Sequence, residues 1–197
     1  IASRPGQQLY VDADKNGIIN EFDKQVIGYA QPDFTLGISN SFSYKNFEMS
    51  INVDGQFGQQ ICNVANFNLR GFHGSQQLAI VKDAWTAENQ SKDYPRVSML
   101  NTGAQAFLMS DKVIEDGSFW RLQNVTLGYR FSSYFLSRIK IRSAKVYASG
   151  SNLMMITNYS GYNPDVSLNG TNSLQMGHDN AGYPVARTFR VGLDLQF

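Results

Sequence analysis

Several residue types and patterns are scarce in this 197-residue sequence, and each scarcity excludes something. Its single cysteine, Cys62, rules out a disulfide within the chain. No run approaches the roughly 20 consecutive apolar residues that a membrane-spanning helix requires, so this chain would cross a bilayer only as strands. A net charge of +1, with lysine and arginine scattered along the chain, argues against nucleic acid as a partner.

Signals of catalysis are sparse as well. His73 and His178 are the only histidines, and no nucleophile motif accompanies them. Glu115 and Asp116 are adjacent in sequence, but nothing in the sequence indicates that they face a cleft. We therefore expect that the protein is not an enzyme.

The sequence does contain alternating apolar and polar residues, the pattern of strands with two different faces. Five segments show it, at about residues 34–44, 47–57, 119–131, 145–155 and 187–197. In the last segment, odd-numbered positions from Phe189 to Phe197 are apolar and the positions between them are polar or glycine. Such a strand either packs on a second sheet, as in a soluble sandwich, or faces lipid, as in an outer-membrane barrel.

The lengths of the connections favour the barrel. Only Lys45 and Asn46 separate the first two strands, which predicts a tight hairpin, and a modest segment joins the third to the fourth. The other connections, 58–118 and 156–186, are long. Outer-membrane barrels combine short periplasmic turns with long external loops, whereas soluble domains seldom carry such loops. The sequence therefore predicts an all-β fold: strands of an antiparallel transmembrane barrel with long extracellular loops.

Two consequences follow from this topology. Six aromatic residues fall at one level, as in an interfacial aromatic girdle: Tyr44, Phe47, Phe131, Tyr134, Phe135 and Phe197. Five strands cannot close a barrel, since roughly eight is the smallest number that natural membrane barrels use. The sequence begins at Ile1 without the features of a signal peptide, so we expect a C-terminal piece of a longer protein that supplies the missing strands.

The N-terminal region, residues 1–33, contains the spacing of a calcium loop. Calcium prefers six to eight oxygen ligands, and alternate positions of a tight turn converge on one point. The residues at the ligand positions are Asp12, Asp14, Asn16, Ile18 through its carbonyl, Asn20 and Asp23. Gly17 permits the sharp bend. The alternative is a metal-free turn in which Asp and Asn side chains cap their own backbone.

A series of motifs runs the length of the chain; in chain order it includes 10–20 (YVDADKNGIIN), 82–86 (KDAWT), 119–129 (FWRLQNVTLGY), 162–165 (YNPD) and 184–189 (PVARTF). Together these motifs resemble the C-terminal third or less of SusC/RagA-type TonB-dependent outer-membrane transporters. Their order and spacing carry the resemblance more than any single motif. Ala87 departs from the proline that this family commonly has after Trp-Thr.

The resemblance implies a 22-stranded barrel in the bacterial outer membrane, with an N-terminal plug and a SusD-like surface lipoprotein as partner. Import of oligosaccharides or peptides would be energised through TonB, which contacts a region upstream of this chain. Residues 1–33 would form an extracellular loop and residues 34–197 the C-terminal part of the barrel, embedded in outer-membrane lipid. Phe197 resembles the C-terminal signature that the barrel-assembly machinery recognises.

The residues that contact substrate stay unknown at this point. Polar side chains predicted to face water or plug are Glu48, Asn52, Asp54, Gln56, Arg130, Arg190 and Asp194. The external loops 63–101 and 158–182 could contact the lipoprotein or substrate. Three loop aromatics, Phe72, Tyr159 and Tyr162, could stack on sugar rings or equally form loop core.

Two other functions use the same features. A soluble, calcium-dependent carbohydrate-binding β-module would have the same strands and the same loop, but it would fold without further chain. A passive porin-like or adhesin barrel would share the membrane but would lack TonB and the lipoprotein.

Overall fold

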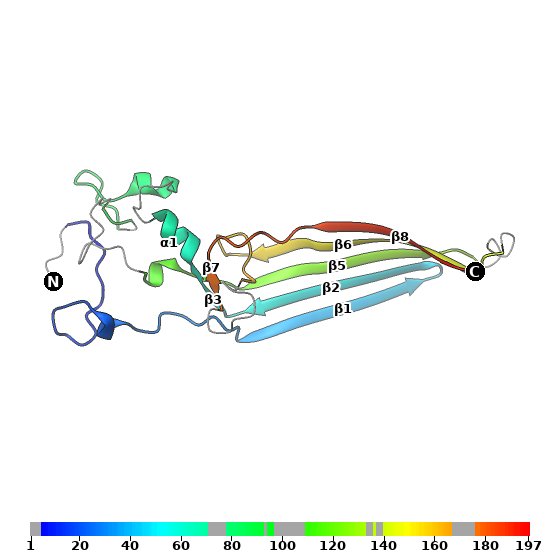
Figure 1. Ribbon diagram of the computed structural model, residues 1–197, viewed down its shortest axis with the longest axis horizontal. Helices are drawn as coiled ribbons and strands as arrows, with labels where there is room; N and C mark the ends of the chain where they lie inside the picture. The colour runs from blue at the N-terminus through cyan, green and yellow to red at the C-terminus, as the bar shows by residue number, and fades with distance from the viewer. Residues whose placement is uncertain are drawn as a thin grey trace.

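The large sheet contains most of the regular structure of the chain. A computed structural model describes residues 5–70, 78–92, 94–96, 109–132, 136, 140–166 and 176–197. Five antiparallel strands form one sheet in the order β1-β2-β5-β6-β8, and Figure 1 shows it as a long blade that makes up one half of the molecule. The strands are β1 (Phe34–Tyr44), β2 (Phe47–Phe57), β5 (Phe119–Arg130), β6 (Ser143–Thr157) and β8 (Thr188–Gln196).

The first two strands have the ranges that alternation predicts, and the later three differ at their ends. β5 stops one residue before Phe131, β8 loses one residue at each end, and β6 is longer by two residues at each end. Alternation in β6 is blurred because Tyr147 lies on its polar side, where Gly192 leaves room for the ring. The backbone pairing nevertheless continues to Thr157, which pairs with Phe119.

The strand register sorts the large sheet into two chemically different faces. One row runs across all five strands as Phe42, Met49, Leu127, Ala148 and Val191, each paired with the next. We call the side that carries this row the apolar face. Because successive side chains of a strand point to opposite sides, the neighbouring residues belong to the other face.

The opposite side, which we call the polar face, carries the adjacent row. That row is Ser41, Ser50, Thr126, Ser149 and Arg190, again paired from strand to strand. The continuity of both rows over five strands shows that the separation of faces belongs to the whole sheet.

The described part of the chain leaves the apolar face without a covering layer. Side chains are 57% exposed at Phe42, 53% at Leu127 and 81% at Val191. Contiguous exposed apolar surface of this kind marks a face that meets something other than water.

One end of the large sheet holds the hairpin turn and the chain terminus (Figure 1). The turn lacks glycine, and Lys45 adopts a left-handed φ of 53° in its place. The amide of Asn46 donates to the Arg130 carbonyl at 2.6 Å, which ties the turn to the next strand.

Part of the expected aromatic girdle gathers at this end. Tyr44 pairs with Phe47, the Phe47 ring lies 4.9 Å from Tyr129, and Phe131 lies 5.3 Å from Tyr129. Phe197 follows β8 and is 85% exposed. The predicted members Tyr134 and Phe135 lie outside the described residues.

At the other end, segments expected only as connections form a small sheet. Its strands are β3 (Gln60–Asn63), β4 (Ile114–Asp116) and β7 (His178–Asp179), in the order β4-β3-β7, with β7 parallel to β3. The side chains of Ile61, Val113 and Phe119 are each 1% exposed, so this end has the packed core that the large sheet lacks.

The described helices are short and belong to the same end. α1 (Val64–Arg70) follows β3, and three single-turn helices are η1 (Glu21–Asp23), η2 (Ala79–Asp83) and η4 (Asp111–Val113). Leu78, Val81, Ala84 and Trp85 recur at three- and four-residue spacing, which predicts a helix, and the structure has the 3-10 helix η2 there. None of the helices in the described ranges is long and apolar enough to cross a membrane.

Candidate functional site

Two groups of charged side chains lie on the polar face. Near the hairpin end, Glu48 accepts hydrogen bonds from Arg130 at 2.7 Å and from Lys145 at 2.6 Å, and we call these three residues the Glu48 cluster. Near the small sheet, Arg121 donates to Asp54 at 2.7 Å and to Asp165 at 3.0 Å, forming the Arg121 cluster.

These clusters account for three residues that alternation placed on this face, namely Glu48, Asp54 and Arg130. Asn52, predicted to face the same way, accepts a hydrogen bond from Ser39 at 2.6 Å. Arg190 belongs to the polar row, and Asp194 pairs in register with Lys145.

Arg121 is the important residue that alternation missed. Its side chain is only 15% exposed, and its guanidinium carbon lies 5.4 Å from the centre of the buried Phe119 ring. The register shifts between Leu122 and Asn124, so the apolar positions change from even to odd numbers along β5. That change of phase in the sequence is the signal that would have placed Arg121 on the polar face.

Asp165 belongs to a segment without regular structure that is held in place at several points. Residues 158–166, which we call the anchored segment, follow β6 directly. The Arg121–Asp165 bond holds one end of this segment to the large sheet. The other end, around Tyr159 and Ser160, is held by the small sheet.

Glu115 of β4 provides the first contact with the small sheet. It accepts from the backbone N–H and the hydroxyl of Ser160, both at 2.9 Å. Asn63 and Asn66 also donate to it, at 3.0 and 3.3 Å. Burial alone would raise the pKa of Glu115, but these hydrogen bonds outweigh it and leave the pKa lowered, so the carboxylate stays ionised at neutral pH.

Tyr159 provides the second contact. Its hydroxyl donates to Asp179 of β7 at 2.5 Å, and its side chain is 6% exposed. Burial, assisted by the Asp179 carboxylate, strongly raises the pKa of Tyr159, so the hydroxyl keeps its proton. Of the two interpretations open for this aromatic residue, the structure supports loop core.

Tyr162, on the same segment, behaves differently. Its side chain is 73% exposed, whereas Asn163 beside it is 9% exposed and hydrogen-bonds the backbone of Asp165. The ring is therefore presented by a packed backbone. Phe72 and His73 lie outside the described residues.

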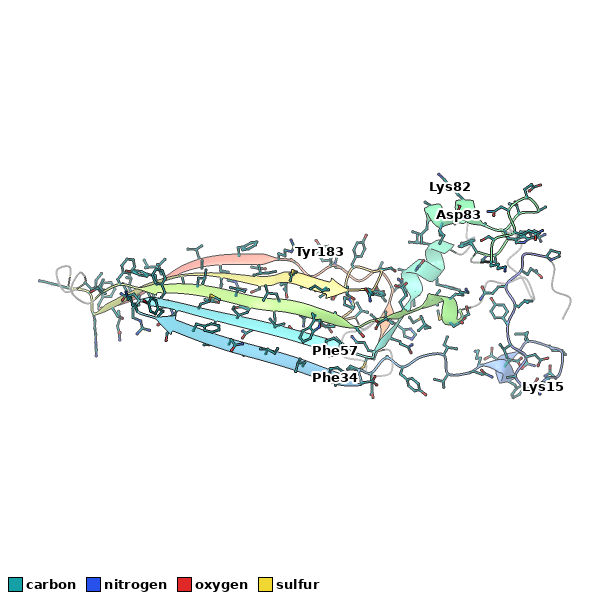
Figure 2. All side chains as sticks on the ribbon, turned by 180° about the vertical axis from the view of Figure 1, so that it is seen from behind. Lys15, Phe34, Phe57, Lys82, Asp83 and Tyr183 are labelled. Carbon is teal, nitrogen blue, oxygen red and sulfur yellow. The ribbon has the colours of Figure 1, made fainter. Side chains whose placement is uncertain are left out.

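The calcium-loop segment lies far from the strand turns, as the label on Lys15 shows in Figure 2. Carboxylate oxygens of Asp12, Asp14 and Asp23 all lie within 4.8 Å of one another. The bend uses left-handed conformations at Lys15 and Gly17, with φ of 60° and 81°. The predicted spacing thus brings three hard oxygen donors together.

Backbone N–H groups donate to all three carboxylates, as in the metal-free turn: Gly17 to Asp12, Asn16 to Asp12 and Asp14, and Ala13 and Asn20 to Asp23. Asn16 and Asn20 also have partners within the segment. The Asn16 amide donates to Asp14 at 2.6 Å, and its oxygen accepts from the Ile18 N–H at 2.7 Å. Asn20 caps η1 by accepting from the Phe22 N–H at 2.8 Å. A hydrogen bond from the Asn20 backbone N–H is the chief cause that lowers the pKa of Asp23, so this carboxylate is in the ionised form that a metal requires.

Cys62 is buried in β3, its thiol 3.5 Å from the Met109 sulfur, and burial raises its pKa, which disfavours the reactive thiolate. His178 lies in β7, whose backbone pairs with Cys62. Glu115 and Asp116 lie in β4, and the Asp116 carboxylate accepts from Ser118 at 2.6 Å. These contacts are structural ones, within and beside the small sheet.

Comparison with known proteins gives matches along nearly the whole chain, although no family model matches it. TonB-dependent receptor P3 of Formosa agariphila is 33% identical over 99% of the chain and 19% of the receptor. TonB-dependent receptor SusC of Bacteroides thetaiotaomicron is 29% identical over 98% of the chain and 18% of the receptor. The chain therefore spans about a fifth of the length of the curated relatives it matches.

Solved structures show the same fold. The RagAB peptide importer in the closed-closed state superimposes with a TM-score of 0.72, at 25% identity, over 98% of the chain and 20% of that structure's chain. A second RagAB structure gives a TM-score of 0.71 at 20% identity over 92% of the chain. The mostly β-strand architecture is thus shared with RagA.

Proposed function

The chain corresponds to a segment of a SusC/RagA-type TonB-dependent receptor, and from that premise we propose that it forms part of the barrel wall of an outer-membrane importer. The transported material would be an oligosaccharide or a peptide. A SusD-like lipoprotein would cover the receptor from outside, and TonB would energise import through a region of the parent upstream of this chain.

The separation of the two faces of the large sheet carries this proposal. A soluble sandwich would cover the apolar row with a second layer, but Phe42, Leu127 and Val191 are exposed in the described chain. A barrel in lipid places that face outward and the face with Arg121 and Glu48 toward the water-filled interior. The soluble carbohydrate-binding module is therefore the weaker alternative.

The two edges of the large sheet support the same proposal. β1 and β8 are its outermost strands, each paired on one side only within the described residues. Backbone groups left unpaired in lipid cost several kcal/mol each, so a wall of this kind needs neighbours on both sides. The rest of a 22-stranded parent would supply them.

Assembly of the parent would use the end of the large sheet at which β8 stops. Phe197 follows this strand with its ring 85% exposed. We propose that it contributes to recognition by the barrel-assembly machinery. Deleting Phe197 from the parent should lower the amount of folded receptor, and unchanged insertion would argue against this role.

The calcium-loop segment is proposed to bind Ca²⁺. The three convergent carboxylates of Asp12, Asp14 and Asp23 fit the hard-oxygen donors that this cation prefers. Bound calcium would fix the segment that precedes β1, as an extracellular loop. In the parent receptor, Asp14→Asn should abolish protection of this segment from protease by calcium, whereas Glu21→Gln, an exposed carboxylate paired with Lys24, should not.

The experiment that tests the proposed function is extraction of the native parent from membranes, with gel mobility compared before and after boiling. A large, heat-modifiable membrane species that co-purifies with a lipoprotein is the expected result. A soluble monomer of 22.0 kDa would contradict it and would favour the carbohydrate-binding module.

A further inference from the structure

A cavity of about 170 Å³ has no role in the function proposed so far. It lies between the C-terminal end of β6, the anchored segment and the residues that lead into β8. Its polar lining residues are Arg121, Asn152, Tyr162, Asn163 and Arg187. The cavity is smaller than the roughly 300–1,000 Å³ of sites for drug-sized ligands, so it suits one ring-sized unit of a larger ligand.

A bulge in β6 forms one wall of this cavity. The register with β5 passes from Ser151 to Met154, which leaves Asn152 and Leu153 unpaired, and Asn152 has a left-handed φ of 54°. Its amide donates to the Ala186 carbonyl at 3.2 Å and so holds the chain before β8 in place. Bulges re-aim side chains in this way beside functional sites.

Tyr162 forms the opposite wall of the cavity. The backbone that carries this exposed residue is held at several points. The anchored segment that carries it is bound by Asp179, by Glu115 and, three residues beyond Tyr162, by Arg121. A ring that is 73% exposed on a backbone fixed at three points is preorganised. Binding to it loses little conformational entropy.

The charges around the cavity are unequal. Arg121 is compensated by Asp54 and Asp165. Arg187, in contrast, forms no ion pair with any carboxylate in the described ranges, so its guanidinium is available to a ligand. A sugar ring presents C–H groups on its faces and hydroxyls around its rim, which suits a flat aromatic ring with a guanidinium beside it.

We propose that Tyr162 is a stacking contact for a sugar ring of the transported ligand, and that Arg121 positions it through Asp165. This inference rests on the proposed function and specifies the ligand class of the same receptor. Arg121 lines the cavity, but its guanidinium is occupied by Asp54 and Asp165. Its part is to hold Asp165, and with it the segment that presents the ring.

The test uses the full-length receptor, purified with its lipoprotein, and titration with oligosaccharides that the native cells take up. Tyr162→Ala should weaken binding about tenfold, since truncating one well-placed aromatic contact removes about 1.4 kcal/mol. Tyr162→Phe keeps the ring and should bind within about twofold of wild type. Tyr29→Ala is the matched control, because Tyr29 is equally exposed, at 73%, but lies outside the cavity.

A double-mutant cycle separates positioning from a general structural role. Arg121→Leu should weaken binding in the wild-type background and have little further effect once Tyr162 is alanine, because both changes remove the same contact. Arg130→Leu, in the Glu48 cluster, should leave affinity unchanged. Heat-modifiability of each variant reports whether the barrel itself is intact.

Two results would overturn the inference without touching the proposed function. One is a folded, importing receptor in which Tyr162→Ala binds sugar as wild type does, or in which the two changes are additive. The other is a receptor that binds only peptides. A parent that is not a membrane receptor at all would instead contradict the proposed function.

Discussion

The large sheet and the small sheet of this chain place their apolar residues in opposite ways. At the small sheet, Ile61 and Val113 are 1% exposed and polar groups are joined in a network around Glu115. On the large sheet, residues as apolar as Val191 are 81% exposed and the ion pairs lie on the other face. The small sheet follows the rule for a protein in water, and the large sheet follows the rule for one whose surroundings differ on its two sides.

This difference explains what holds each part together. The small sheet and the anchored segment have partners within this chain: Tyr159 donates to Asp179, and Ser160 donates to Glu115. The large sheet has a continuous backbone ladder but neither a covering layer nor closed edges. Its stability is therefore expected to depend on the lipid and neighbouring strands of the proposed barrel.

The largest effect should come from placing a charge on the apolar face. Ile38→Arg is expected to destabilise the folded receptor by about 2–4 kcal/mol, because Ile38 lies at the middle of β1, away from the aromatic girdle. Ser39→Arg is the matched control, since it adds the same charge to the neighbouring residue of the polar face. The measurement is the fraction of heat-modifiable receptor in the outer membrane, and equal losses for both variants would remove the distinction between the faces.

A smaller effect is expected from breaking the Arg121 cluster. Arg121→Leu leaves Asp54 without its charge partner and should lower stability by about 1–3 kcal/mol. Arg130→Leu should cost less than about 1 kcal/mol because the Arg130 side chain is 62% exposed. The stability of the two variants is compared by the temperature at which each loses its folded gel mobility. A lower temperature for Arg130→Leu than for Arg121→Leu would contradict this ranking.

Within the anchored segment, Tyr159→Phe should increase protease cleavage more than Tyr162→Phe does. Removing the Tyr159 hydroxyl deletes the bond to Asp179, worth about 0.5–1.5 kcal/mol. The Tyr162 hydroxyl forms no hydrogen bond with the described residues, so Tyr162→Phe removes none. Protease cleavage within residues 158–166 of the native receptor measures the difference, which would be absent if the Tyr159 bond did not hold the segment.

The smallest effect concerns pH. The pKa of Glu115 is lowered from its ordinary value of 4.5, so its contribution to stability is complete above that value and is lost as pH falls through the lower, folded-state pKa. Wild-type receptor should therefore show more cleavage in the anchored segment at strongly acidic pH than at pH 7. Glu115→Gln should be cleaved more readily at pH 7 and should respond less to acid; an unchanged acid response would implicate another group.

The strands of the large sheet could be predicted from the sequence because their environment imposes a period of two on every residue. β1 and β2 show this period with one break each, at Asn40 and at Gly55. β6 was predicted too short because Tyr147 breaks the pattern on the polar side and small residues weaken it on the apolar side.

The small sheet and the Arg121 cluster could not be predicted in the same way. β3, β4 and β7 are four, three and two residues long, too short to show any period. Asp165 reaches Arg121 across 44 residues of sequence, a contact that the fold determines. The convergence of Asp12, Asp14 and Asp23, by contrast, is local, and their spacing alone was enough to indicate it.

The central claim is that the large sheet faces water on one side and lipid on the other. The most direct test is to place single cysteines along β8 of the parent, in a Cys62→Ser background, and to label intact cells with a membrane-impermeant thiol reagent. Positions 190, 194 and 196 should react, and positions 189, 191 and 193 should be protected. Uniform labelling of all six positions would contradict the claim and show that both faces of the sheet meet water.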